Sequence, residues 1–253
     1  MIRSRLIGTL TAVVLAASAA PWPACAGPPF ATDDPVPVDP GHWEVYGFST
    51  RVDGDEDRTG TLAGVEINYG AAPNLQLHLI APLTFDDPKG GPFKTGPGDL
   101  ELGAKYRLLN ASPATGGWQA AVFPLLEVPT GKCQEGLGDG HLRAFLPLWI
   151  QRDFGAWTTY GGGGYWINPG VGNRDYWFAG WLLQRRVAPR LSVAGELFYQ
   201  TADETDGRDS AGFNLGLIYD ITARYHLLIS AGRGLQNARS NAFSYYVGLQ
   251  STF

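Results

Sequence analysis

Charged and hydrogen-bonding side chains recur at every second position within several apolar segments of the sequence. In one such segment, Leu191, Val193 and Leu197 alternate with Ser192 and Glu196. Alternation of this kind places apolar side chains on one face of a β-strand and polar side chains on the other. The candidates for chemistry share the polar phase; they are Glu44, Glu66, His78, Glu101, Lys105, Arg107, His141, Arg143, Gln184, Arg186, Glu196, Gln200 and His226.

Both signs of charge occur in this set, which limits where the polar face can lie. If the apolar faces contact lipid, a bare charge facing lipid would cost roughly 2–4 kcal/mol near the midplane. The charged groups must therefore pair or meet water in the lumen of a barrel. That lumen is either a constriction that sorts solutes by size and charge or a lattice of ion pairs that fills a narrow barrel. The same phase holds aromatic side chains, which suit an aromatic solute and equally a packed plug: Phe145, Trp149, Tyr160, Trp166 and Phe198.

The four histidines do not indicate a catalytic centre. His42, His78, His141 and His226 have no serine or aspartate at a spacing that announces a nucleophile with its base. We therefore predict that the protein is not an enzyme. Because some outer-membrane barrels hydrolyse lipids, assembly of a catalytic site in space stays open.

An acidic segment has the spacing of a calcium loop without its other residues. Asp53, Asp55 and Asp57 alternate, but Arg58 and Gly64 stand where an EF-hand has glycine and glutamate. A solvated acidic loop is the better interpretation. No metal and no cofactor are expected.

The period of two extends over most of the chain and predicts an all-β protein. Segments of about ten residues suit tilted membrane strands. About twelve are expected, near 43–50, 59–69, 75–85, 100–110, 117–130, 140–152, 156–168, 176–187, 191–201, 211–219, 225–233 and 242–253. Short connections alternate with longer, more polar ones. The sequence thus predicts an antiparallel transmembrane β-barrel of about 12 strands, with short periplasmic turns and longer extracellular loops.

The N-terminal region has a different composition from the barrel. Residues 1–26 contain Arg3, an apolar run and Ala24-Cys25-Ala26, which together predict a cleaved secretory signal peptide. Residues 27–40 are rich in proline and are expected to form an extended periplasmic arm or a partial plug. Residues 41–253 are the predicted barrel. Export predicts location in a bacterial outer membrane.

The net charge of −5, from 19 basic and 24 acidic side chains, argues against nucleic acid as a partner. The expected partners are outer-membrane lipid, lipopolysaccharide and a small-molecule solute. The chain ends on Phe253, with Leu249, Val247 and Tyr245 on the same face of the last segment. This ending is similar to the signal that the outer-membrane assembly machinery reads, although Ser251 departs from the usual apolar residue.

Aromatic residues near the predicted strand ends fit a girdle at the lipid headgroups, although ordinary core packing is the alternative. They are Trp43, Trp118, Trp157, Trp177 and Tyr176.

Several short motifs resemble one known family. They are Pro29-Phe30-Ala31-Thr32-Asp33-Asp34-Pro35, Gly41-His42-Trp43-Glu44, Gly96-Pro97-Gly98-Asp99-Leu100, Phe123-Pro124, Pro129-Thr130-Gly131, Tyr165-Trp166-Ile167-Asn168-Pro169-Gly170 and Gly180-Trp181-Leu182-Leu183-Gln184. With these motifs the chain resembles the phenol meta-pathway degradation family of outer-membrane β-barrel proteins. The resemblance implies a transporter-like barrel, often encoded beside catabolic genes, that admits apolar or aromatic compounds.

The predicted function is therefore an outer-membrane channel for passive uptake of small apolar or aromatic compounds. Two alternatives stay open. One is a structural or adhesive outer-membrane barrel with a plugged lumen, and the other is an outer-membrane lipid hydrolase.

Overall fold

The computed structural model describes residues 28–111 and 116–253. Within these residues the chain forms antiparallel strand segments and one short 3-10 helix, Cys133–Glu135. The segments are β1 (Trp43–Asp53), β2 (Asp57–Ala72), β3 (Leu75–Pro88), β4 (Lys94–Pro97), β5 (Leu100–Asn110), β6 (Trp118–Val122), β7 (Leu125–Val128), β8 (Arg143–Phe154), β9 (Trp157–Ile167), β10 (Tyr176–Ala188), β11 (Leu191–Gln200), β12 (Ser210–Asp220), β13 (Tyr225–Gln236) and β14 (Phe243–Thr252).

Two strands of the wall are interrupted, so the segments make a barrel of twelve strands. Both β4 and β5 pair with β3, and both β6 and β7 pair with β5 and β8. The first break falls at Gly98-Asp99 and the second at Phe123-Pro124, where proline has no N–H to donate to the ladder. Counting each broken strand once confirms the predicted number.

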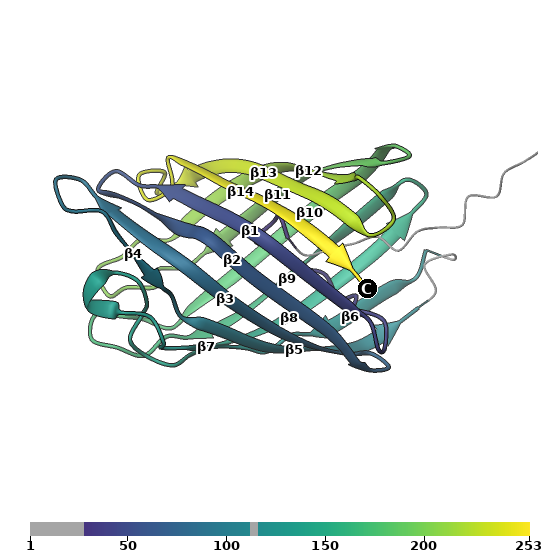
Figure 1. The fold of residues 1–253 in the computed structure, drawn as a ribbon, viewed down its shortest axis with the longest axis horizontal. Coiled ribbons are helices and arrows are strands. Elements are labelled where there is room, and N and C mark those ends of the chain that lie inside the picture. Colours follow the sequence, from purple (N-terminus) through teal and green to yellow (C-terminus); the bar gives the residue numbers. More distant parts are fainter. Residues whose placement is uncertain (1–27, 112–115) are drawn as a thin grey trace, which may run out of the picture.

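The first and last strands close the barrel. β1 pairs with β14 from Glu44 opposite Thr252 to Asp53 opposite Phe243. At the end of this seam, Trp43 and Phe253 exchange backbone hydrogen bonds of 3.1 and 2.9 Å. Figure 1 shows the closed wall, with strands tilted against its long axis and the C-terminus at one end.

Alternation of burial along the strands separates an apolar outer face from a polar inner face. In β10, Leu182 and Gln184 are buried while Trp181 and Leu183 are nearly half exposed. The same outward exposure of large apolar side chains recurs around the wall, at Val65, Leu77, Leu102, Leu126, Leu146, Val193, Leu197, Leu215, Ile229, Val247 and Leu249. This continuous apolar belt is what a transmembrane barrel requires on its lipid side.

The connections differ between the two ends of the barrel. At the end where β1 begins and β14 ends, here the periplasmic end, two-residue turns join β2 to β3, β8 to β9 and β10 to β11. The opposite, outer end carries longer connections, including 129–142, 168–175 and 201–209. One expectation fails: β1 and β2 extend until only residues 54–56 join them, although a longer loop was predicted there. No helix among the described residues is long and apolar enough to cross a membrane.

The chain that precedes β1 occupies part of the space inside the wall. An extended periplasmic arm or a partial plug was expected here, and residues 28–40, here called the arm, run inside the barrel (Figure 1). Two small apolar clusters accompany it on the inner face: Tyr46, Ile218 and Leu228, and Phe123, Phe145 and Trp149.

Candidate functional site

The arm is attached to inner-face side chains from opposite parts of the wall. The carboxylate of Glu196 in β11 accepts hydrogen bonds from the backbone N–H groups of Ala31 and Thr32, at 3.1 to 3.2 Å. It also accepts the Thr32 hydroxyl at 3.2 Å. On the other side, Gln76 in β3 accepts the N–H of Val38 at 2.9 Å. These bonds supply partners for backbone N–H groups of the arm, which has no strand of its own to bond with.

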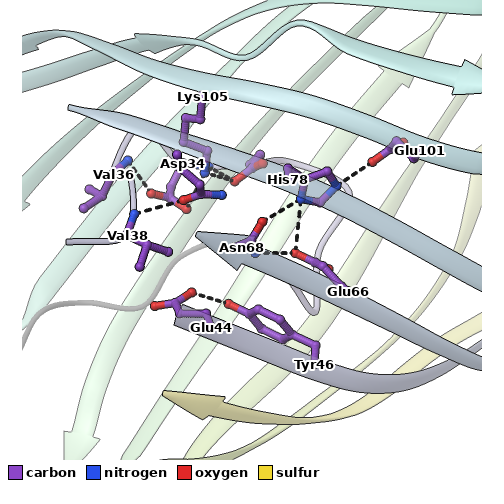
Figure 2. A network of polar contacts seen from close by, with 12 residues as sticks. Asp34, Val36, Val38, Glu44, Tyr46, Glu66, Asn68, His78, Glu101 and Lys105 are labelled. Atoms are coloured by element: carbon purple, nitrogen blue, oxygen red, sulfur yellow. Dashed lines mark hydrogen bonds and ion pairs between the residues drawn. The ribbon is translucent and has the colours of Figure 1, made fainter. Parts of the chain in front are cut away.

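An ion cluster adds a second attachment. Lys105 in β5 is buried and its Nζ lies 3.0 Å from Asp33 Oδ1 and 3.5 Å from Asp34 Oδ2. The side chain of Asp34 is almost fully buried and its Oδ1 accepts the N–H of Val36 at 2.6 Å. Figure 2 shows Lys105 directed at this acidic turn of the arm. Both carboxylates thus have a cationic partner inside the barrel.

Glycines on the wall leave the space that the arm occupies. A Cβ at Gly180 would lie 2.0 Å from the Thr32 hydroxyl, and one at Gly70 would lie 2.1 Å from the carbonyl oxygen of Asp39. Both contacts are far inside van der Waals distance. The close approach of arm and wall therefore requires the absence of a side chain at these positions.

A row of polar groups crosses β2, β3 and β5 beside the arm (Figure 2). Asn68 donates to Glu66 at 2.8 Å and its amide oxygen faces His78 Nδ1 at 2.7 Å. The other ring nitrogen of His78 lies 2.9 Å from Glu101 Oε1. Because both ring nitrogens face acceptors, the arrangement favours an imidazolium between Glu66 and Glu101. The members of this buried row therefore serve as hydrogen-bond partners for one another.

A cavity of about 350 Å³ lies between the arm and the outer end. One part of its lining is aromatic, from Phe30, Phe123, Phe145, Trp149, Trp166, Tyr176 and Phe178. Its remaining lining includes the polar side chains Asp33, Glu66, His78, Glu101 and Gln200. A volume in this range, mostly apolar with a few convergent polar groups, is typical of small-molecule sites.

Aromatic contacts give the cavity an ordered wall. The rings of Phe145 and Trp166 stack with centroids 4.8 Å apart, and Phe178 meets Phe145 edge-on at 6.2 Å. Tyr176 stacks on the other side of this group, 5.8 Å from Trp166. The Tyr176 hydroxyl accepts a hydrogen bond from Arg143 at 2.7 Å, and the Arg143 guanidinium lies 4.8 Å from the Trp166 centroid. These contacts hold the rings of the aromatic wall against one another.

The predicted site residues divide into groups in the structure. Glu66, His78, Glu101 and Gln200 line the cavity, and Lys105 and Glu196 bind the arm. The others on the inner face bond to neighbours or are buried there: Glu44, Arg107, Arg143, Gln184 and His226. Two lie elsewhere, because His141 is exposed in the loop before β8 and Arg186 is exposed at the periplasmic end of β10. His141 lies outside a strand, so the alternation does not apply to it. Arg186 lies in β10, but so close to the end of the barrel that an inward-facing side chain there is exposed.

The sequence missed several cavity residues. Tyr176 was assigned to the girdle, yet it is 5% exposed and points inward, whereas Trp177 beside it is 58% exposed. Tyr176 and Phe178 are separated from Gln184 by even numbers of residues in the same strand. This spacing could have predicted that both side chains point inward, as Gln184 does. Phe30 and Asp33 could not be placed in this way, because the arm has no strand period.

Two histidines, together with the acidic side chains near them, are candidates for parts of an enzyme or metal site in the described part of the chain. His226 Nδ1 lies 2.7 Å from Asp220 Oδ1, near the periplasmic end. His78 faces an amide and a carboxylate, not a hydroxyl nucleophile. No group of three or more His, Cys, Asp or Glu side chains among residues 28–111 and 116–253 could hold a metal ion.

The fold is similar to that of solved outer-membrane barrels. The COG4313 outer membrane channel from Pseudomonas putida F1 matches with a TM-score of 0.73 and 16% sequence identity, covering 87% of this chain and 98% of that chain. The KdgM porin matches with a TM-score of 0.59 and 13% identity, covering 83% and 99%. The β domain of the Bordetella autotransporter BrkA matches with a TM-score of 0.54 and 16% identity, covering 85% and 100%.

No family model and no curated protein sequence matches the chain. The resemblance to the phenol meta-pathway family therefore stays a prediction from sequence motifs. At these low identities the structural likeness concerns the fold, and it confirms the antiparallel transmembrane β-barrel.

Proposed function

We propose that the protein is an outer-membrane channel that admits small apolar or aromatic compounds by passive diffusion. The observation that carries this proposal is the aromatic cavity of about 350 Å³ between the arm and the outer loops. An apolar cavity of about 150 Å³ already holds a benzene molecule. The volume found here therefore has room for a substituted ring.

The fold supports the same role. Barrels of similar architecture include a protein described as a channel and one described as a porin. The KdgM porin has also been solved with oligogalacturonate. A polymer of uronic acids suits this cavity poorly, because Asp33, Glu66 and Glu101 in the lining carry charge of the same sign.

One structural feature favours the plugged barrel as a second candidate. The arm occupies the lumen below the cavity and is bonded to Glu196, Gln76 and Lys105. A solute that enters the cavity can reach the periplasm only if the arm shifts or leaves a path beside it. If the arm does neither, the barrel is structural and conducts nothing.

Uptake into vesicles distinguishes these candidates. The refolded barrel is placed in lipid vesicles, and entry of phenol-like solutes is compared with entry of sugars of similar size. Faster uptake of the aromatic solutes, with stepwise single-channel conductance, supports the channel. A folded barrel that passes neither class contradicts it and leaves the structural role, or lipid hydrolysis, which a release assay on labelled phospholipid then tests.

A pair of tryptophan substitutions ties uptake to the cavity. Ile80→Trp adds a large ring at a position that lines the cavity, whereas Leu77→Trp adds the same ring on the outer face of the same strand. We expect the first variant to slow aromatic uptake and the second to leave it unchanged. Equal uptake by both variants would place the solute path elsewhere.

A further inference from the structure

The three cations around the cavity each contact two carboxylates. His78 lies between Glu66 and Glu101, at 3.7 and 2.9 Å. Lys105 lies between Asp33 and Asp34, at 3.0 and 3.5 Å. Each of these groups has two carboxylates and one basic side chain, so each has a formal charge of −1 when all members are ionised.

Arg143 repeats this pattern at the outer edge of the cavity. Its guanidinium contacts Glu127 at 3.2 Å and also contacts Asp139. Around this cavity, the ion pairs of the described residues therefore bring six carboxylates together with three cations. Three of these carboxylates, Asp33, Glu66 and Glu101, line the cavity together with its aromatic side chains, and an additional cation would be stabilised beside them.

In the lining itself, carboxylates outnumber cationic groups, because His78 is the one basic side chain among the lining residues. Asp33, Glu66 and Glu101 line the cavity, whereas no lysine or arginine is among its lining residues. The side chains of Glu101 and Asp33 remain 20% and 23% exposed, so an incoming ligand can reach their carboxylates. The side chain of Glu66, at 6% exposure, is held within the polar row.

The opposite part of the lining consists of aromatic rings. Their faces attract cations, and aromatic surroundings recognise ammonium groups in other binding sites. Within this protein, Arg143 already lies over Trp166 at 4.8 Å, and Lys105 lies 4.9 Å from the Phe123 centroid. The cavity thus combines carboxylates with the apolar surface that would hold the body of an organic cation.

A separate observation indicates an unfilled hydrogen-bonding position. Trp149 is 1% exposed and lines the cavity, and its indole Nε1 has no hydrogen-bond partner among the described residues. A buried donor of this kind is costly unless an acceptor reaches it. The Nε1 atom is covered by neighbouring protein atoms, so a ligand oxygen in the cavity reaches it once the surrounding side chains shift.

From these observations we infer that the cavity binds organic cations, with an ammonium group against Glu101 and Asp33 and an aromatic, hydroxyl-bearing body among Phe145, Trp166 and Phe178. This inference rests on the proposed function and narrows its solute class. Among aromatic compounds of one size, cations bind more tightly than neutral compounds, and anions bind most weakly.

Three probes of nearly equal size test the charge preference. Tyramine is a cation, tyrosol is its neutral counterpart with a hydroxyl in place of the ammonium group, and 4-hydroxyphenylacetate is an anion. Binding to the refolded protein in non-ionic detergent is measured by isothermal titration calorimetry, with empty micelles as the blank. We expect tyramine to bind about fivefold or more tightly than tyrosol. Equal affinity of the two, or absence of binding by all three, overturns the inference, and the vesicle uptake assay tests the proposed function separately.

Two carboxylate variants locate the effect. Glu101→Gln removes one cavity charge and keeps an acceptor for His78, and it should weaken tyramine binding about fivefold while tyrosol binding stays the same. Asp220→Asn is the matched control, because Asp220 also contacts a histidine on the inner face but does not line the cavity. Equal losses of tyramine binding in both variants would overturn the assignment of Glu101.

A tryptophan variant tests the hydroxyl position. Trp149→Phe keeps a ring and removes the indole N–H. In the parent protein, tyramine should bind more tightly than phenethylamine, which lacks the hydroxyl, and the variant should lose that difference. A difference that persists in Trp149→Phe would overturn the role of Trp149.

Discussion

The hydroxyl of Thr32 lies where a side chain on Gly180 would have to be, since a Cβ there would come within 2.0 Å of it. The substitution Gly180→Ala should therefore displace the arm at Thr32 and weaken its bonds to Glu196. We expect higher ion conductance of the barrel in planar bilayers. The double variant Gly180→Ala with Thr32→Ala removes the clashing hydroxyl and should return conductance toward that of the parent.

Gly47 is the control for this substitution, because a Cβ there has nothing within 4 Å. Gly47→Ala should conduct as the parent does. If Gly180→Ala also conducts as the parent does, the arm does not limit the pore.

Removal of the Lys105 ammonium should destabilise the folded barrel. Lys105→Met leaves Asp33 and Asp34 without their cation in a buried environment, and breaking a buried pair in this way costs about 3–5 kcal/mol. Urea unfolding followed by tryptophan fluorescence measures the free energy of unfolding. Adding Asp33→Asn and Asp34→Asn should recover most of the loss, whereas a triple variant no more stable than Lys105→Met would argue against unpaired charge as the cause.

Two leucines with nearly equal exposure test the depth of the apolar belt. Leu215 is 63% exposed at the middle of β12, and Leu235 is 62% exposed near the outer end of β13. The substitution Leu215→Arg should lower the unfolding free energy in vesicles by roughly 2–4 kcal/mol, whereas Leu235→Arg should lower it by about 0–1 kcal/mol. Equal costs would mean that the membrane midplane does not cross β12 near Leu215.

The loop between β11 and β12 depends on one carboxylate. Hydrogen bonds from the Tyr199 hydroxyl and from the N–H of Ala202, the latter at 2.9 Å, hold the pKa of Asp209 below its ordinary value. A lowered pKa in the folded state stabilises the loop at neutral pH, and this contribution is lost as the pH falls through that pKa. The amide proton shift of Ala202 should therefore titrate in acid, with a midpoint below the ordinary 3.8.

The same anchor can be tested at neutral pH by proteolysis. Asp209→Asn cannot accept the Tyr199 hydrogen bond through its amide nitrogen, and trypsin should cut faster at the exposed Arg208. Asp206→Asn, also in this loop, serves as the control. Identical cleavage rates in the two variants would show that Asp209 does not anchor the loop.

The barrel could be predicted because the alternation of apolar and polar residues can be recognised within each strand separately. Strands such as β10 and β13 alternate between buried and exposed residues, and this alternation is visible in their residue types. The break at Pro124 lies inside the predicted strand 117–130 and was not separated out, because both β6 and β7 pair with β5 and β8. The short segment β4 lies outside the predicted strands, and the strand that it pairs with is β3.

The filling of the lumen could not be predicted from the same pattern. Lys105 was placed on the inner face by its phase, but its partners Asp33 and Asp34 lie in a segment without a period. Glu196 similarly binds backbone groups of Ala31 and Thr32, which leave no trace in residue type. A strand period fixes which way a side chain points and carries no information about what it meets in the lumen.

The path of the arm also affects the order in which the molecule can be completed. Its first described residues bond to positions far along the chain, with Pro29 accepting from Ser230 and Thr32 donating to Glu196 across 201 and 164 residues. Contacts between segments so distant in sequence form only after a large loop has been closed, which slows their formation. The segment that leaves the ribosome before every strand can meet Gln76 and Lys105 early, but it acquires its contacts with Glu196 and Ser230 only after β11 and β13 have been made.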